Sequence, residues 1–230
     1  MNQIKQQTST HLQRKRAELN RRRDALIDSF SKAASNKRPA KLSATYKRIC
    51  QTNEFLRALE HIEAEGKSSP DTGARRYTVS SLFLHQCFQT LTADEKEQFV
   101  FITGSEVGGV LVLDQAMDLV HERRTVMGVE AEPKSTHRLL IKLEQFGHRL
   151  LAHFHSHPGR GPEATHPSGI DQRFQQRLET AGHVALAAIF SRDGYIRFFR
   201  LDHNFSLEIH GAGVEECEPN VYRLTNLAAS

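Results

Sequence analysis

Apolar residues recur along the chain with two different periods, and the change of period divides it into two regions. In the first region Leu12, Leu19, Leu26 and Ala33 repeat every seven residues, which predicts a long helix. A second helix is predicted over residues 43–65. Further along, short apolar runs alternate with helical patterns, which predicts strands mixed with helices.

The second region has the element order of an α/β domain. Strands are predicted at 77–80, 99–103, 107–113, 125–129, 150–154, 184–190, 195–201 and 205–209. Helices are predicted at 81–91, at 133–146 and from Ser168 onward. This order predicts an α/β fold with a mixed, curved sheet. The polar, glycine-containing stretch 66–73 is predicted to be a linker. We therefore divide the chain into a helical arm with its linker at 1–73, a domain at 74–211 and a C-terminal tail at 212–230.

One stretch is typical of a metal site. The apolar run 150–154 leads into His155-Ser156-His157-Pro158, and side chains two apart on a strand point to the same side. Fourteen residues after His157, Asp171 lies in the first turn of the helix that Ser168 begins. Two imidazoles and one carboxylate can bind one ion and leave a fourth tetrahedral position for water, as in catalytic rather than structural sites.

Each part of this pattern also has a structural interpretation. A His-x-His on a strand is common, and Ser168 with Asp171 three residues later is a capping box that starts a helix. The two interpretations of Asp171 are compatible, because one carboxylate oxygen can face the helix start while the other faces a metal.

The combined stretch resembles the signature of the JAMM (MPN+) metalloproteases, in which an upstream Glu precedes His-Ser/Thr-His-Pro, a short loop and Ser-x-x-Asp. Residues 155–158 and 168–171 match that signature position by position. The upstream Glu of the family stands in a pattern like Glu-x-x-Gly-x-Leu, which residues 106–111 fit. The loop between His157 and Ser168 is longer than the usual family spacing.

The resemblance implies an MPN fold (a cytidine-deaminase-like arrangement), zinc as the metal and Glu106 as the general base. Ser168 would donate its hydroxyl to the negative charge that develops during hydrolysis. His153 shares the strand face of the two histidine ligands and would orient one of them, with a packed core histidine as an equal interpretation. His166, in the longer loop, would reach a substrate or the metal, with a solvated loop as the default.

JAMM enzymes typically hydrolyse the isopeptide bond that joins ubiquitin or a ubiquitin-like protein to a lysine. The resemblance therefore implies a zinc isopeptidase, similar to deubiquitinases, that removes such a modifier or matures its precursor. It is greatest to bacterial members that accompany ubiquitin-like conjugation enzymes, some of them in antiphage defence operons. Two alternatives stay open: a peptidase that releases a sulfur carrier or an amino-acid adduct, and a non-catalytic MPN scaffold that docks an acidic partner.

Composition favours a cytoplasmic protein. No apolar run approaches the length of a membrane span, and the basic, polar first thirty residues carry no secretory signal. The three cysteines are widely spaced and odd in number, which indicates neither a disulfide framework nor a cysteine metal site. A reducing compartment suits them.

Charge is unevenly divided along the chain. Residues 1–50 hold 13 Lys/Arg against 3 Asp/Glu, whereas residues 51–230 hold 18 against 24, so a basic arm precedes an acidic body. We interpret the arm as an element for packing or for docking a conjugation-pathway protein. A nucleic-acid contact is disfavoured, because the basic clusters contain no aromatic residues and no nucleic-acid-binding module is recognisable.

Overall fold

The computed structural model describes residues 2–36, 38–65, 73–107, 109–117, 121–125, 128–131, 149–225 and 227. The chain divides into two compact units, Met1–Asp71 with Glu106–Val110 and Thr72–Ser105 with Leu111–Ser230. The predicted helix 133–146 and most of the predicted linker 66–73 lie outside the described residues. Within the part of the chain that the structure describes, no helix has both the length and the apolar character needed to cross a membrane.

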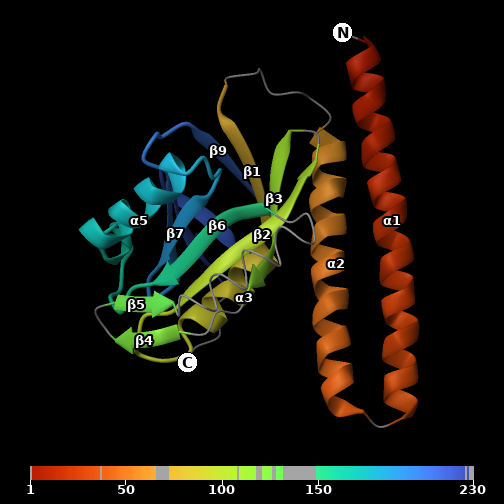
Figure 1. The fold of residues 1–230 in the computed structure, drawn as a ribbon, viewed down its shortest axis with the longest axis horizontal. Helices are drawn as coiled ribbons and strands as arrows, with labels where there is room; N and C mark the ends of the chain where they lie inside the picture. The colour runs from red at the N-terminus through yellow and green to blue at the C-terminus, as the bar shows by residue number, and fades with distance from the viewer. Residues whose placement is uncertain are drawn as a thin grey trace. The chain divides into compact units, whose positions relative to one another are not determined.

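The first unit is built on two long helices, α1 (Asn2–Ser35) and α2 (Pro39–Glu65) (Figure 1). The two helices pack on each other, which confirms the predicted helical arm. Three members of the predicted seven-residue repeat, Leu19, Leu26 and Ala33, are buried. The side chain of its first member, Leu12, lies outside the described part. Among the residues whose burial the structure describes, the buried apolar ones of the two helices are Leu19, Leu26, Ala33, Phe55, Leu56 and Leu59.

The second unit is organised around a nine-stranded mixed sheet with the order β10-β11-β8-β7-β6-β2-β3-β1-β9. The strands are β1 (Arg75–Ser80), β2 (Phe99–Val107), β3 (Val110–Met117), β6 (Arg149–Ser156), β7 (Leu186–Phe190), β8 (Tyr195–Phe199), β9 (Phe205–His210), β10 (Val214–Glu218) and β11 (Val221–Leu224). β6 pairs with β7 in parallel and with β2 in antiparallel orientation. The predicted α/β class with a mixed sheet is thus confirmed.

Shorter elements complete the described part of this unit. Helix α3 (Ser81–Leu91) occupies its predicted position, and α5 (Gly169–Thr180) begins directly after Ser168. A single turn of 3-10 helix, η1 (Pro162–Thr165), lies between β6 and α5. β4 (His121–Thr125) and β5 (Gly128–Ala131) form a separate two-stranded sheet, where the sequence predicts one strand.

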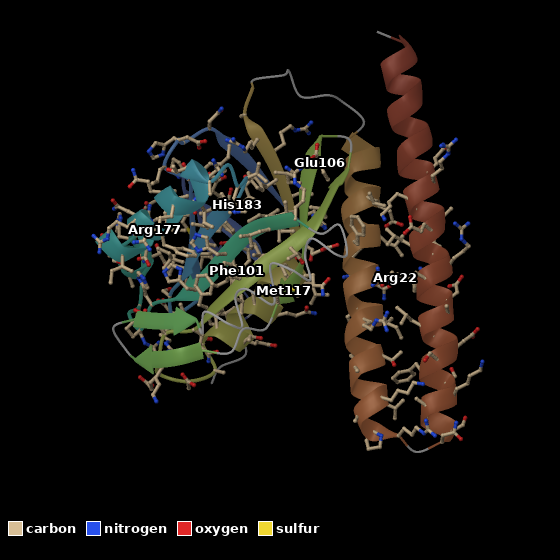
Figure 2. All side chains as sticks on the ribbon, in the orientation of Figure 1. Arg22, Phe101, Glu106, Met117, Arg177 and His183 are labelled. Atoms are coloured by element: carbon tan, nitrogen blue, oxygen red, sulfur yellow. The ribbon has the colours of Figure 1, made fainter. Side chains whose placement is uncertain are left out.

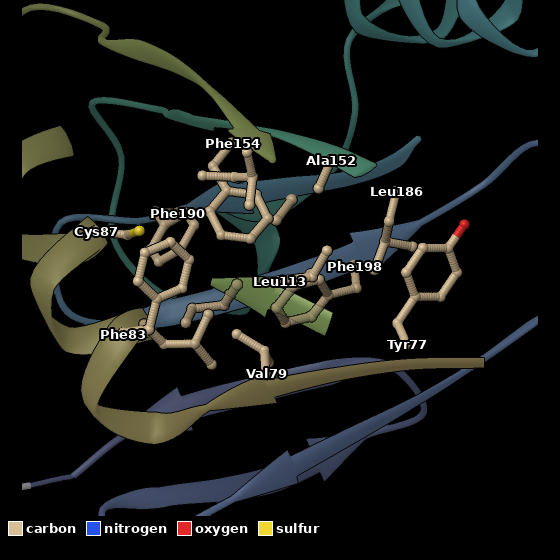
Figure 3. Close-up of a cluster of buried hydrophobic side chains, with 14 of the residues drawn as sticks. Tyr77, Val79, Phe83, Cys87, Leu113, Ala152, Phe154, Leu186, Phe190 and Phe198 are labelled. Atoms are coloured by element: carbon tan, nitrogen blue, oxygen red, sulfur yellow. The ribbon is translucent and has the colours of Figure 1, made fainter. Parts of the chain in front are cut away.

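The two faces of β6 enter different apolar clusters, because alternate side chains of a strand point to opposite sides. Ala152 and Phe154 lie in the larger cluster together with Phe83 of α3 (Figure 3). On the other face, Phe101 of β2 packs with Phe174 of α5 in a smaller cluster (Figure 2 labels Phe101). Hence α3 covers one face of the sheet, and α5 covers the face on which the histidines of β6 lie.

The sequence predicted a tail from residue 212 onward. In the structure this C-terminal segment is part of the domain. β10 and β11 form a hairpin, and Tyr222 of β11 pairs with Ile196 of β8. Val221 and Leu224 are buried. The prediction was wrong because β10 is an acidic edge strand whose exposed side chains show no alternating apolar pattern.

Candidate metal centre

β6 places two histidines at the end of a buried strand. His155 pairs with Phe99 of β2 on one side and with Ile189 of β7 on the other. His157 follows the strand, and its backbone N–H still donates to the carbonyl oxygen of Phe190 at 2.9 Å. Because β6 lies inside the sheet, neighbouring strands hold both residues on the face that α5 covers, as the alternation of a strand predicts.

The position of Asp171 is set by the start of α5. Ser168 is the N-cap residue: its Oγ accepts a hydrogen bond from the Asp171 N–H at 3.3 Å, and its own N–H donates to Asp171 Oδ2 at 2.7 Å. The predicted capping box is confirmed. The second carboxylate oxygen, Oδ1, lies 3.2 Å from His155 Nε2, so one side chain serves the helix start and the histidine pair together.

His155, His157 and Asp171 form a cluster whose candidate ligand atoms all lie within 4.8 Å of one another. The two Nε2 atoms are 3.2 Å apart, and Asp171 Oδ2 lies 3.4 Å from His157 Nε2. Ligand atoms about 2.0–2.1 Å from a tetrahedral ion are separated by about 3.3–3.4 Å. The separations of 3.2–3.4 Å fit that arrangement, so this group can hold a metal ion.

A hydrogen bond at Nδ1 of His157 fixes which ring nitrogen of this residue faces the cluster. His157 Nδ1 lies 2.8 Å from the carbonyl oxygen of Ala164 in η1. A carbonyl oxygen only accepts hydrogen bonds, so Nδ1 carries a proton and Nε2 is the nitrogen that faces the cluster, where its lone pair can bind a metal ion once its own proton is lost. This is the orientation that a metal-binding histidine requires.

The longer loop between β6 and α5 supplies that carbonyl. The backbone N–H of Gly161 donates to both carboxylate oxygens of Asp193, at 2.8 and 3.0 Å, and Asp193 also accepts from Ser191 Oγ at 2.7 Å. A Cβ atom on Gly159 would stand 2.7 Å from the Cβ of Ala164. The loop is therefore closely packed and supports His157.

The charges of the cluster favour an ionised Asp171. Burial alone would raise the pKa of Asp171, but hydrogen bonds from His155 and His157 hold that pKa well below its usual range. Burial alone would lower the pKa of His157, but the hydrogen bonds to Asp171 and to the Ala164 carbonyl raise it above its ordinary value. A carboxylate between two imidazoles attracts a cation, whether a proton or a metal ion.

His153 lies on the same face, one pleat before His155. It is buried, and burial lowers its pKa to about 3, which keeps the ring neutral. Its Nε2 lies 2.8 Å from Oε1 of Gln175, and its ring stacks on Phe99 at 5.6 Å between centroids. His153 is thus a packed histidine with one polar partner on α5, next to the cluster and not part of it.

β2 does not bring Glu106 to the cluster, which corrects the prediction. In the register of β2 and β6, Phe99 lies opposite His155 and Gly104 opposite Arg149. The strand therefore leads away from the cluster, and Glu106 is seven residues past Phe99, roughly 23 Å at about 3.3 Å per residue. The glycine that completed the Glu-x-x-Gly pattern, Gly109, has a φ of 80° and belongs to the turn after β2.

Glu97, which was not among the residues predicted from the sequence, carries a carboxylate close enough to the cluster for the charges of His157 and Asp171 to act on it. Burial raises its pKa, and the charges of His157 and Asp171 also act on that pKa, in opposite directions. Its backbone is held where β2 begins: the Gln98 N–H donates to Ser156 Oγ, and the Ser156 N–H donates to the Gln98 oxygen, both at 3.0 Å. The available sequence signal was an acidic residue two positions before a predicted strand.

The remaining predicted residues lie before α5. Ser168 is exposed at the helix start, close to the candidate ligand Asp171. His166 is also exposed, and its Nε2 lies 3.3 Å from a carboxylate oxygen of Glu163 and 3.4 Å from a guanidinium nitrogen of Arg197. These contacts tie His166 to the loop and to β8, away from the predicted role at the metal.

Comparisons with known proteins leave the family open. No protein-family model and no curated protein matches the chain. Among solved structures, the chain is similar to the solution structure of protein DSY2949 from Desulfitobacterium hafniense, with 15% sequence identity and a TM-score of 0.43, over 59% of this chain and 94% of that one. The functional evidence therefore comes from the cluster itself.

Proposed function

We propose that the chain is a zinc-dependent peptidase of the JAMM type with an MPN fold. The observation that supports this best is the arrangement of His155, His157 and Asp171, whose ligand atoms are separated by 3.2–3.4 Å. Two imidazoles and one carboxylate are a ligand set of catalytic zinc sites, which keep one position open. The His157 tautomer, set by the Ala164 carbonyl, fits the same role.

Zinc bound by these ligands would supply Lewis acidity that makes water nucleophilic near neutral pH. The other steps fall to side chains of the chain. Glu97 accepts a proton from the attacking water and returns it to the leaving amine. Its place beside His157 and Asp171 suits this role, and burial raises its pKa toward the neutral range in which a general base works best.

Ser168 is the candidate donor to the oxygen that gains negative charge. A hydroxyl has one donor hydrogen and two acceptor lone pairs. The capping bond from the Asp171 N–H uses a lone pair, so the hydroxyl hydrogen stays free to donate. Ser168 can therefore cap α5 and stabilise the developing charge at the same time.

The substrate that we propose is the isopeptide bond between a ubiquitin-like modifier and a lysine, or the C-terminal extension of the modifier's precursor. This assignment rests on the resemblance of residues 155–158 and 168–171 to the JAMM signature. An amide with a poor amine leaving group requires both an activated water and proton delivery, which the cluster and Glu97 would provide. The basic arm would dock a conjugation-pathway protein in the cytoplasm.

Metal content of the purified protein is the first test. The wild type is expected to hold about one zinc per chain, and the His155→Ala/His157→Ala double variant none. A folded wild type that takes up no zinc would overturn the metal centre and favour a non-catalytic scaffold.

A panel of ubiquitin-like precursors and lysine conjugates then tests the reaction, with cleavage expected for the wild type and not for the double variant. Zinc uptake without cleavage of either kind of substrate would retain the metal centre and overturn the substrate assignment.

A further inference from the structure

Helix α5 carries three polar residues one turn apart toward the sheet. Asp171, Gln175 and Glu179 recur every four residues, so they lie on one side of the helix. Asp171 reaches the metal cluster, and Glu179 accepts a hydrogen bond from the Leu201 N–H at 2.9 Å. Gln175, between them, is fully buried. The Gln175 side chain is a neutral amide, so it is not buried there to pair with a charge. Its hydrogen-bond partners therefore indicate what it does.

The amide of Gln175 is satisfied on both sides. Its Nε2 donates to Glu179 Oε1 at 2.6 Å and to the carbonyl oxygen of Ala185 at 2.9 Å. Its Oε1 lies 2.8 Å from His153 Nε2. Because the two partners of the amide nitrogen are both oxygens, the amide has one orientation, and His153 must donate to Oε1. Gln175 thereby ties α5 to β6 and to the start of β7.

The Gln175–His153 contact runs beside the contact between Asp171 and His155. Gln175 follows Asp171 by four residues, which is a rise of about 6.0 Å along a helix. His153 precedes His155 by two residues, which is about 6.6 Å along a strand. The two spacings agree, so the pairs form two neighbouring rungs between α5 and β6. One rung joins two candidate metal ligands, and the other is a hydrogen bond of defined length.

The hydrogen-bonded rung leaves one buried polar atom without a hydrogen-bond partner among the described residues. Gln175 has no exposed surface, and Nδ1 of His153 is buried without a hydrogen-bond partner among the described residues. Two apolar side chains at these positions would avoid the desolvation of the polar groups. The polar pair is therefore better explained by the geometry that it imposes than by the stability that it adds.

We propose that Gln175 is a positioning residue of the metal centre, and that its bond to His153 holds α5 at the distance from β6 at which Asp171 meets His155. The proposal rests on the metal site of the proposed function and not on its substrate. With an apolar residue at position 175, α5 would contact this face through apolar packing such as that of Phe174 and Leu178, which allows the helix to shift.

The test compares two adjacent glutamines. Gln175→Met removes the buried amide at nearly constant size, and Gln176→Met makes the same change at an exposed position of the same helix. Competition with a chromophoric chelator measures zinc affinity, and the visible spectrum with cobalt(II) in place of zinc reports coordination geometry. We expect Gln175→Met to weaken zinc binding by about 10- to 100-fold and to alter the cobalt spectrum, and Gln176→Met to do neither.

A double-mutant cycle tests whether the bond to His153 transmits the effect. His153→Phe alone is expected to weaken zinc binding as Gln175→Met does, and the double variant is expected to bind no more weakly than either single variant. Losses that simply add would overturn the proposal, because the two residues would then act independently.

Phe198→Leu, in the larger apolar cluster, controls for a general loss of stability. Unchanged zinc affinity in Gln175→Met, or an equal loss in Phe198→Leu at a matched drop in melting temperature, would overturn the proposal. If Gln175→Met does not fold, Gln175→Asn, which withdraws the amide by one methylene, takes its place with the same expectation. A wild type that binds no zinc would instead overturn the metal centre, so the two failures are distinguishable.

Discussion

Phe99 on β2 lies directly opposite His155 on β6, and this pairing determines which glutamate can act at the cluster. Glu97 precedes Phe99 by two residues, whereas Glu106 follows it by seven. We expect Glu97→Gln to slow hydrolysis by about 10²- to 10⁴-fold, because a positioned base contributes that much, while zinc stays bound. Glu106→Gln is the matched control and should keep the wild-type rate. Cleavage rates and zinc content check both, and the opposite ranking of the two variants would return the role of base to Glu106.

Two substitutions separate the roles of the capping box. Asp171→Asn keeps an oxygen that can accept the Ser168 N–H but loses the anionic ligand, so α5 should begin normally while zinc affinity falls at least about 100-fold. Ser168→Ala removes the N-cap and should lower the free energy of unfolding by about 1 kcal/mol without loss of zinc. Thermal unfolding and chelator competition measure the two effects. Zinc loss in Ser168→Ala would mean that the cap is needed to place Asp171.

Gly159→Ala is expected to weaken zinc binding, although Gly159 itself is not a candidate ligand. The new Cβ would stand 2.7 Å from the Cβ of Ala164, whose carbonyl oxygen accepts from His157 Nδ1. The loop must shift, so we expect zinc affinity to fall about tenfold, as for other groups that orient a ligand. Gly169→Ala is the control, because the nearest atom there is the flexible end of Arg173. Equal zinc affinity in the two variants would contradict this role of the loop.

The buried guanidinium of Arg200 makes stability depend on pH. It donates to both carboxylate oxygens of Asp202, at 2.8 and 2.9 Å, and lowers the pKa of Asp202 from 3.8 to about 2. The folded state therefore binds this proton less tightly than the unfolded state. The contribution is complete above pH 3.8 and is lost as the pH falls through about 2.

Urea unfolding at pH 7 and along an acid series measures this contribution. Asp202→Asn should be less stable than the wild type at pH 7, and the difference should shrink toward pH 2. The side chain of Asp202 is 36% exposed, so solvent screening keeps the effect modest. A difference that stays constant over the acid range would show that the charge of Asp202 is not its cause.

The C-terminal hairpin should contribute to the stability of the whole domain. Leu224 is 2% exposed and lies in the larger apolar cluster. Leu224→Ala should therefore lower the free energy of unfolding by about 2–5 kcal/mol. Glu215→Ala, on the exposed strand β10, should change it by less than about 0.5 kcal/mol. Two equally small effects in chemical denaturation would mean that residues 212–230 are a tail after all.

The sequence by itself determined the relations between near neighbours in the chain. α3 occupies the predicted range 81–91, because its buried apolar residues repeat at helical spacing. His155 and His157 share a face because strand side chains alternate, and the box formed by Ser168 and Asp171 needs only four consecutive residues. Such local rules were sufficient for α3, for the start of α5 and for the three candidate metal ligands.

Only the tertiary structure decided which distant residues support those ligands. The register of β2 against β6 brings Glu97 to the cluster in place of Glu106, and the packing of the loop brings up the carbonyl of Ala164. Gln175 meets His153 only because α5 lies across β6. A strand of given pattern can pair at several offsets, and the packing of the whole sheet selects one of them. No local pattern contains that choice, which is why the sequence indicated the ligands but not their partners.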